Sequence, residues 1–222
     1  MEDKKLTEKE SLDLITQMIN KAKDSVHDTG ITAIMWGAVI TLCSLVRLAE
    51  VRYDFRLPFD IYMLTVVAVI PTIIFSVREK KARRVKVYGE EFNDYLWIAF
   101  GISVFLVSII TTKLGNDVRP LIDGYEKLAG QRSPFHFYEY VSSFFLMLYG
   151  LPTFVSGVCM KFKPMTFGGI FCWVCAIVTL YTTAQVDLLL TAISAIMAWL
   201  IPGILLEIEH RKAKQALKPT HV

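Results

Sequence analysis

The spacing best suited to redox or metal chemistry is the pair Cys172-x-x-Cys175. A redox pair of this kind usually lies at the exposed start of a helix in a thioredoxin-like βαβ unit. Here it falls inside the apolar stretch 165–183, with no soluble domain beside it. The position favours a structural role, with redox or metal chemistry as the alternative. The other cysteines, Cys43 and Cys159, also lie in or beside apolar stretches, so no disulfide framework is expected.

Two carboxylate–imidazole pairs have the spacing of one helical turn. His136 and Glu139 stand three residues apart, and so do Glu207 and His210. One turn can bring two such side chains to one metal ion, but neither pair has a third ligand nearby in the sequence. Each pair is therefore interpreted as a solvated helix end, and the sequence predicts no metal and no other cofactor.

A run of six basic residues separates the second and third apolar stretches. Its members are Arg78, Lys80, Lys81, Arg83, Arg84 and Lys86. Such a run could bind nucleic acid, but its place between two membrane spans favours contact with anionic lipid headgroups, and no nucleic-acid partner is expected.

These residues must be positioned by elements that are mainly apolar. The chain of 222 residues is 54% hydrophobic, and six long stretches have no charge in their middle: 31–46, 61–77, 96–112, 141–160, 165–183 and 188–206. About 20 helical residues cross a hydrocarbon core. The stretches lack the period-two alternation of barrel strands, so helices are favoured. The sequence predicts an all-α, multi-pass membrane protein with six transmembrane helices. The lipid bilayer is its expected environment.

The placement of basic residues predicts the orientation. Of the 24 Lys and Arg residues, 17 fall in the N-terminal segment, the second and fourth connections and the tail, against 7 in the other connections. The positive-inside rule then places both termini in the cytoplasm. No carboxylate, Lys, Arg or His lies at mid-span, and Asp187 and Glu207 are near span ends. Coupled ion transport is disfavoured on this ground.

Residues 1–30 form a distinct predicted element. Thr7 and Glu10 have capping-box spacing, and an apolar stripe follows at alternating steps of three and four. This amphipathic helix could lie on the inner membrane surface, pack on the protein's own loops, or pair with a partner or a second copy. The sequence divides into this helix, a six-helix domain over residues 31–208 and a cytoplasmic tail over residues 209–222.

One interpretation of the spans is a repeat of three hairpins, with chance similarity in apolar composition as the alternative. The even-numbered spans carry Pro71, Pro152 and Pro202, and the odd-numbered spans carry a glycine beside an aromatic residue, Gly37, Gly101 and Gly168. The hydroxyls of Thr72 and Thr153 could bind the carbonyls that the prolines leave free. Small residues recur at steps of four and predict close helix contacts, within or between chains. The third connection, 115–134, includes a possible short surface helix over residues 118–130.

The segment of residues 5–19, then Asp28-Thr29-Gly30 and Trp36-Gly37, resembles a group of uncharacterised bacterial multi-pass inner-membrane proteins. That resemblance implies the cell inner membrane as the location and transfers no functional residue.

Packing features outnumber chemical ones, so we expect a non-enzymatic scaffold, sensor or accessory subunit. Its contact surfaces would be residues 1–30 and the third connection. The alternative is a small permease for a neutral or lipophilic molecule, with a polar cavity lined by Thr72, Tyr149, Thr153 and Thr179. A lipid-modifying enzyme would need His136, Glu139 and a further polar group to meet at the outer interface.

Overall fold

The computed structural model describes Leu12, residues 30–82, 88–131, 133, 135 and 137–216. The amphipathic helix predicted for residues 1–30 therefore lies almost wholly outside the described residues, as do His136 and part of the basic run. Every regular element in the described part is helical, which confirms the all-α fold class.

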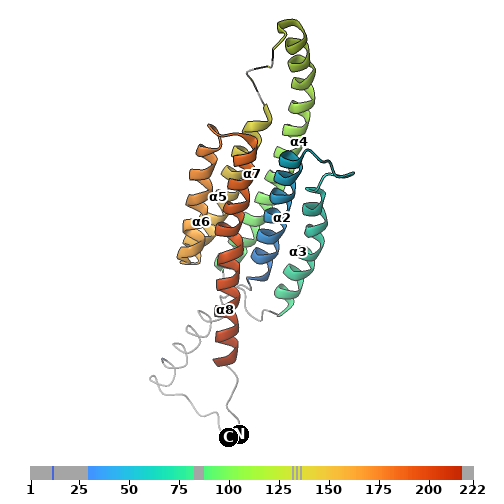
Figure 1. The fold of residues 1–222 in the computed structure, drawn as a ribbon. Coiled ribbons are helices and arrows are strands. Elements are labelled where there is room, and N and C mark those ends of the chain that lie inside the picture. Colours follow the sequence, from blue (N-terminus) through green and yellow to red (C-terminus); the bar gives the residue numbers. More distant parts are fainter. Residues whose placement is uncertain are drawn as a thin grey trace, which may run out of the picture.

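The elements follow one another as long helices with short connections (Figure 1). In chain order they are α2 (Ile31–Tyr53), α3 (Met63–Ala82), α4 (Tyr88–Ala129), the 3-10 turn η1 (Phe137–Tyr140), α5 (Val141–Cys159), α6 (Lys163–Val178), α7 (Ala184–Ala195), the π-helical turn η2 (Ile196–Leu200) and α8 (Ile201–Ala216). Helices dominate because a chain without water around its backbone must satisfy each N–H and C=O within its own segment.

One continuous rod is formed by α7, η2 and α8, and it contains the predicted sixth span. Within it the Ile201 N–H bonds to the carbonyl of Ile196, a wider turn than in an α-helix. Pro202 follows directly; it has no N–H to donate and its ring crowds the preceding turn. The widened π turn relieves that crowding without breaking the rod.

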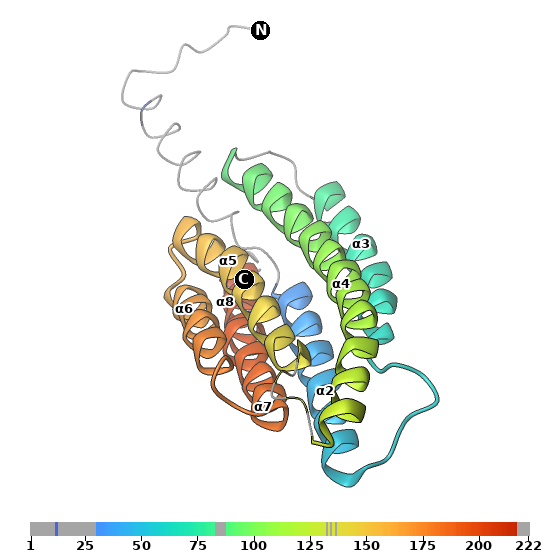
Figure 2. The same ribbon diagram turned by 90° about the horizontal axis from the view of Figure 1, so that it is seen from above.

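The rod is the centre of the bundle. Helices α2, α5 and α6 pack against it, and α5 also packs along α6 (Figure 2). The backbones meet where the sequence predicts small-residue stripes: a Cβ on Gly37 would lie 2.6 Å from the Leu200 nitrogen, and one on Gly168 would lie 2.6 Å from the Ala198 Cα. These close contacts are thus made within one chain.

Helices α3 and α4 lie at the periphery. In the view of Figure 2 they occupy the side of the molecule away from α5, α6 and the rod. Helix α3 packs mainly on α2, and α4 on α5. Their outward faces carry large apolar side chains in the open, such as Val66, Ile70, Ile98 and Phe105. Such faces suit lipid rather than water.

Four helices are long and apolar enough to cross a membrane: Ile31–Tyr53, Phe92–Ala129, Val141–Cys159 and Ala184–Lys212. The predicted second and fifth spans correspond to shorter apolar helices, Met63–Arg78 and Lys163–Val178. The membrane character of the chain is therefore supported by the structure at the level of four candidate spans.

Two boundaries differ from the sequence expectation. Helix α4 has 42 residues, so at 1.5 Å per residue it is about 63 Å long, roughly twice the hydrocarbon thickness. The surface helix predicted for residues 118–130 is the continuation of this helix rather than a separate element. Helix α8 runs to Ala216, past the expected start of the tail at residue 209, because no helix-breaking residue intervenes.

The close backbone contacts at Gly37 and Gly168 predict that adding one methyl group at either position destabilises the protein. We expect Gly37→Ala and Gly168→Ala each to lower the free energy of unfolding by about 1–3 kcal/mol, because the methyl would strike backbone atoms of the rod. Gly101→Ala is the control, since nothing lies within 4 Å of its Cβ position. Thermal unfolding of the purified protein in detergent measures the difference, and equal losses in all three variants would contradict this account.

Candidate functional site

The two predicted carboxylate–imidazole pairs are found at opposite ends of the bundle. Glu139 is half-buried in η1, and its predicted partner His136 lies outside the described residues. Glu207 accepts a 2.7 Å hydrogen bond at Oε1 from Nε of Arg211, one turn further along α8. Among the described residues, no group of three or more His, Cys, Asp or Glu side chains gathers as metal ligands would.

The basic run is described only in part. Arg78 lies near the end of α3 with an exposed side chain, and Lys80 and Lys81 follow on the last turn of that helix. Arg83, Arg84 and Lys86 lie outside the described residues. Contact of these six residues with anionic lipid stays a prediction.

The thiols of Cys172 and Cys175 are enclosed by the bundle, with 0% and 3% of each residue exposed. Both cysteines face the rod, where Ser194 of α7 lies beside them. All four cysteines of the chain are unpaired. Enclosure between helices fits the structural role that the sequence favours for this pair.

The two threonines that directly follow a proline, Thr72 and Thr153, each accept a hydrogen bond from a tryptophan of another element. Thr72 donates to the Ala68 carbonyl at 2.8 Å and accepts a 3.0 Å hydrogen bond from Nε1 of Trp36 on α2. Thr153 donates to the Tyr149 carbonyl at 2.7 Å and accepts a 2.8 Å hydrogen bond from Nε1 of Trp199. In each case one hydroxyl satisfies a carbonyl of its own helix and an indole of its neighbour.

These bonds differ from the sequence expectation in one respect. A helical threonine back-bonds to the carbonyl four residues earlier. The carbonyl that a proline leaves free is four residues before the proline, and hence five before the threonine. Thr72 and Thr153 therefore bind the carbonyls next to the freed ones, and the hydroxyls serve helix contact instead.

The middle of the bundle is filled by aromatic rings, which we call the aromatic cluster: Trp97 and Phe100 of α4, Tyr149 of α5 and Trp199 of η2. The Tyr149 and Trp199 rings are 4.8 Å apart, and Phe100 stands edge-on to both at about 6 Å. Trp97 also donates through Nε1 to Ser156 at 3.1 Å. This cluster is the link between the peripheral α4 and the central rod.

The threonines expected to line a polar cavity form hydrogen bonds to different neighbours. Thr72 bonds to Trp36, Thr153 to Trp199, and Thr179 to Ser143 of α5 at 2.9 Å. A hollow of about 420 Å³ lies on the side of α4. It is lined by Phe105, Ser108, Ile109, Thr112, Lys113 and Asn116, and by none of the expected residues.

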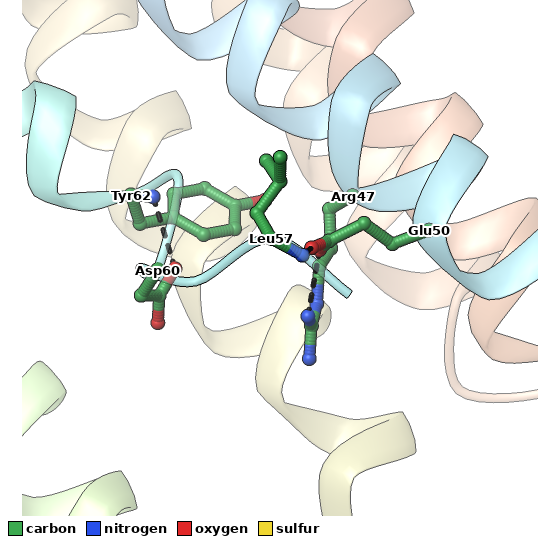
Figure 3. Close-up of polar contacts among 5 residues, drawn as sticks. All are labelled: Arg47, Glu50, Leu57, Asp60 and Tyr62. Atoms are coloured by element: carbon green, nitrogen blue, oxygen red, sulfur yellow. Dashed lines mark hydrogen bonds and ion pairs between the residues drawn. The ribbon is translucent and has the colours of Figure 1, made fainter. Parts of the chain in front are cut away.

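The first polar cluster at the predicted outer end holds the α2–α3 connection in place (Figure 3). Glu50 is only 7% exposed; its Oε1 accepts the Leu57 N–H at 2.9 Å and its Oε2 accepts Arg47 Nη1 at 2.8 Å. Asp60 in turn accepts the Tyr62 N–H at 3.0 Å. The carboxylates thus satisfy backbone donors of a connection that has no secondary structure of its own.

Tyr62 carries this connection into the bundle. Its hydroxyl lies 3.4 Å from that of Ser44 on α2. The ring therefore anchors the connection against α2.

The second polar cluster is centred on Asp187, in the first turn of α7. The burial of this side chain was not anticipated from the sequence. Asp187 is 1% exposed. Its Oδ1 lies 2.5 Å from the Thr182 hydroxyl, and its main-chain carbonyl accepts Thr191 at 2.8 Å. The available signal was a lone carboxylate directly before an apolar run of more than fifteen residues, preceded by two threonines.

Comparisons with protein-family models, with curated proteins and with solved structures find no match to this chain.

The indole–hydroxyl bond at the centre predicts a measurable loss. We expect Trp199→Phe to lower the free energy of unfolding by about 1–3 kcal/mol, because it removes the donor that Thr153 accepts in a buried site. Trp173→Phe is the matched control: its Nε1 donates to the Met147 carbonyl at a more exposed position, so about 1 kcal/mol or less is expected. Thermal unfolding in detergent compares the two, and a larger loss for the control would contradict the assignment.

Proposed function

We propose that this chain is an integral protein of the bacterial cytoplasmic membrane, acting as a non-enzymatic scaffold, sensor or accessory subunit. The observations that support this are the ring-filled centre of the bundle and the local pairing of its hydroxyls. Side chains used in this way hold helices together and leave little room for a substrate.

In this proposal the two shorter apolar helices, α3 and α6, also cross the membrane, giving six spans. Met63–Arg78 and Lys163–Val178 are each about 24 Å long at 1.5 Å per residue, a few ångström short of a typical core. Flanking residues and local thinning of the bilayer accommodate such a mismatch. Both termini are then cytoplasmic, as the charge distribution predicts.

This topology predicts opposite accessibility for two exposed positions. Cys159 is exposed, so both variants are made with Cys159→Ser. In intact cells, a membrane-impermeant maleimide should label Tyr181→Cys in the α6–α7 connection and leave Arg211→Cys on α8 unlabelled until the cells are opened. Labelling of the α8 position in intact cells would contradict the proposed orientation.

The hairpin repeat has mixed support. Gly37 and Gly168 both meet the rod closely, and Thr72 and Thr153 make the same pair of bonds. A Cβ on Gly101, the corresponding glycine of the second hairpin, would meet nothing within 4 Å, and Gly203 stands where the threonine of the third hairpin would be. We propose an ancestral repeat in which the second helix of the third hairpin has become the central rod.

The accessory role is best supported by the exposed end of α4, which is predicted to lie outside the membrane. From Lys113 to Ala129 the helix runs on for about 25 Å past the predicted membrane surface, and Figure 1 shows it standing clear of the other helices. Leu121, Tyr125 and Leu128 share one face of this stretch, at 71%, 44% and 93% exposure. We call it the α4 stripe. Apolar residues exposed outside the hydrocarbon are a typical mark of a protein contact.

Crosslinking tests this surface. In a Cys159→Ser background, Leu121→Cys should form a heavier adduct with a bifunctional maleimide in native membranes, because a partner covers the α4 stripe. Asp123→Cys, two residues along and therefore on the opposite side of the helix, is the matched control and should not. A chain that stays single with both variants, and that tolerates deletion of residues 1–30, would contradict a scaffold or accessory role.

The alternative, a small permease, has the prolines in its favour, since kinked helices are common in moving bundles. Three of its expected cavity residues, Thr72, Thr153 and Thr179, are bonded to side chains of separate neighbours, which makes this the weaker of the two proposals.

A further inference from the structure

Asp187 is buried in a way that an ionised carboxylate tolerates poorly. The residue is 1% exposed, and its Oδ2 has no hydrogen-bond partner among the described residues. A buried carboxylate normally gathers several donors or an opposite charge. A neutral carboxylic acid needs much less, because its second oxygen resembles an ordinary carbonyl.

The hydroxyl of Thr182 gives an independent indication. Its Oγ1 lies 2.5 Å from Oδ1 of Asp187 and 3.3 Å from the carbonyl oxygen of Val178. Both of those oxygens are acceptors when Asp187 is ionised, yet a hydroxyl carries a single proton. If Asp187 holds a proton on Oδ1, it donates to Thr182, and Thr182 donates its own proton on to Val178. Every contact then has a donor and an acceptor.

Among the described residues, the side-chain charges around Asp187 do not favour ionisation; the start of α7, with its free N–H groups, does. From η1, the Glu139 carboxylate acts on Asp187 with the same sign. On α2, Arg47 and Glu50 are paired with each other at 2.8 Å. On α6 the titratable groups are Lys163, at the opposite end of the helix from the α6–α7 connection, and the enclosed thiols of Cys172 and Cys175.

The remaining neighbours add no charge. The described sequences of α5 and η2 contain no Asp, Glu, Lys, Arg or His; Tyr149 and Cys159 are the titratable groups of α5. Asp187 therefore has no described cation to balance it.

We propose that Asp187 is a proton-binding site: a carboxylic acid that keeps its proton at neutral pH and, through Thr182, fastens the α6–α7 connection to α7. At alkaline pH the Oδ1 proton leaves to solvent, Thr182 turns to donate to the carboxylate, and its bond to Val178 is lost. Two negative charges, on Asp187 and Glu139, then act on each other at the outer end of the bundle. This inference goes beyond the accessory role and does not depend on it.

The first measurement is thermal unfolding of the full chain in detergent from mildly acidic to alkaline pH. A native state that holds a proton more tightly than the unfolded chain loses stability as the pH rises. The wild-type melting temperature should therefore fall toward alkaline pH. Asp187→Asn, which replaces the acid by a neutral group of the same shape, should fold and lack this fall, whereas Asp123→Asn on the exposed part of α4 should behave as wild type.

The second measurement can be decided on the wild-type protein alone, with Asp187→Asn as the assignment control. Infrared spectra of the wild-type protein at neutral pH should contain the carbonyl band of a protonated carboxyl group that disappears at alkaline pH, and Asp187→Asn should lack it. Absence of any such band in the wild type at neutral pH would overturn the proposal. So would a melting temperature that rises when sodium replaces choline at constant ionic strength, because Asp187 would then be an ionised cation ligand. A strong destabilisation of a folded Asp187→Asn at every pH would also overturn it.

Discussion

The bundle depends on how closely its helices approach the central rod of α7, η2 and α8. Lipid gives apolar helices no reason to associate, so contact must come from atoms that fit at short range. Gly37 and Gly168 allow the backbones of α2 and α6 to reach η2 from two sides. The π turn shifts the register of the rod at this level and lets Pro202 follow without a break. The other inner contacts, including the buried serine and alanine positions Ser194, Ala195 and Ala198, lie along the same rod.

Two tryptophan–threonine pairs inside the bundle satisfy their polar groups close to where they originate. Trp36 with Thr72 and Trp199 with Thr153 each join two elements and cap a backbone carbonyl at the same time. Because one hydroxyl makes two such hydrogen bonds, an apolar bundle can contain these side chains without leaving them unsatisfied. This pairing also supports the proposed role of the protein's surfaces, because these hydroxyls are bonded to neighbouring helices.

The exposed surfaces of the bundle differ in polarity between its sides and between its ends. Helices α3 and α4 present broad apolar faces, and α4 carries its apolar stripe well past the predicted membrane boundary. The end predicted to face outward also contains the two polar clusters, one around Glu50 and one around Asp187. Glu50 balances its charge with Arg47 and a backbone donor, whereas Asp187 has neither a cation nor a second donor among the described residues. Two buried carboxylates at this end thus differ in their surroundings: Glu50 is balanced by a cation, whereas the described residues offer none to Asp187.

The sequence by itself determined the helical class, the positions of the apolar helices and the small-residue stripes, because these depend on local composition and a fixed helical period. It also placed Cys172 and Cys175 in a structural setting correctly as far as burial goes. It placed Asp187 near a helix end, as found, but gave no sign of its burial, since distance from a span end says nothing about whether neighbouring helices close over a side chain. Only the tertiary structure decided that Thr72 and Thr153 serve tryptophans on other elements, that α4 continues past the bundle and that Asp187 is enclosed. Each of these is set by which helices become neighbours, and a linear pattern of apolar residues is nearly the same for many such arrangements.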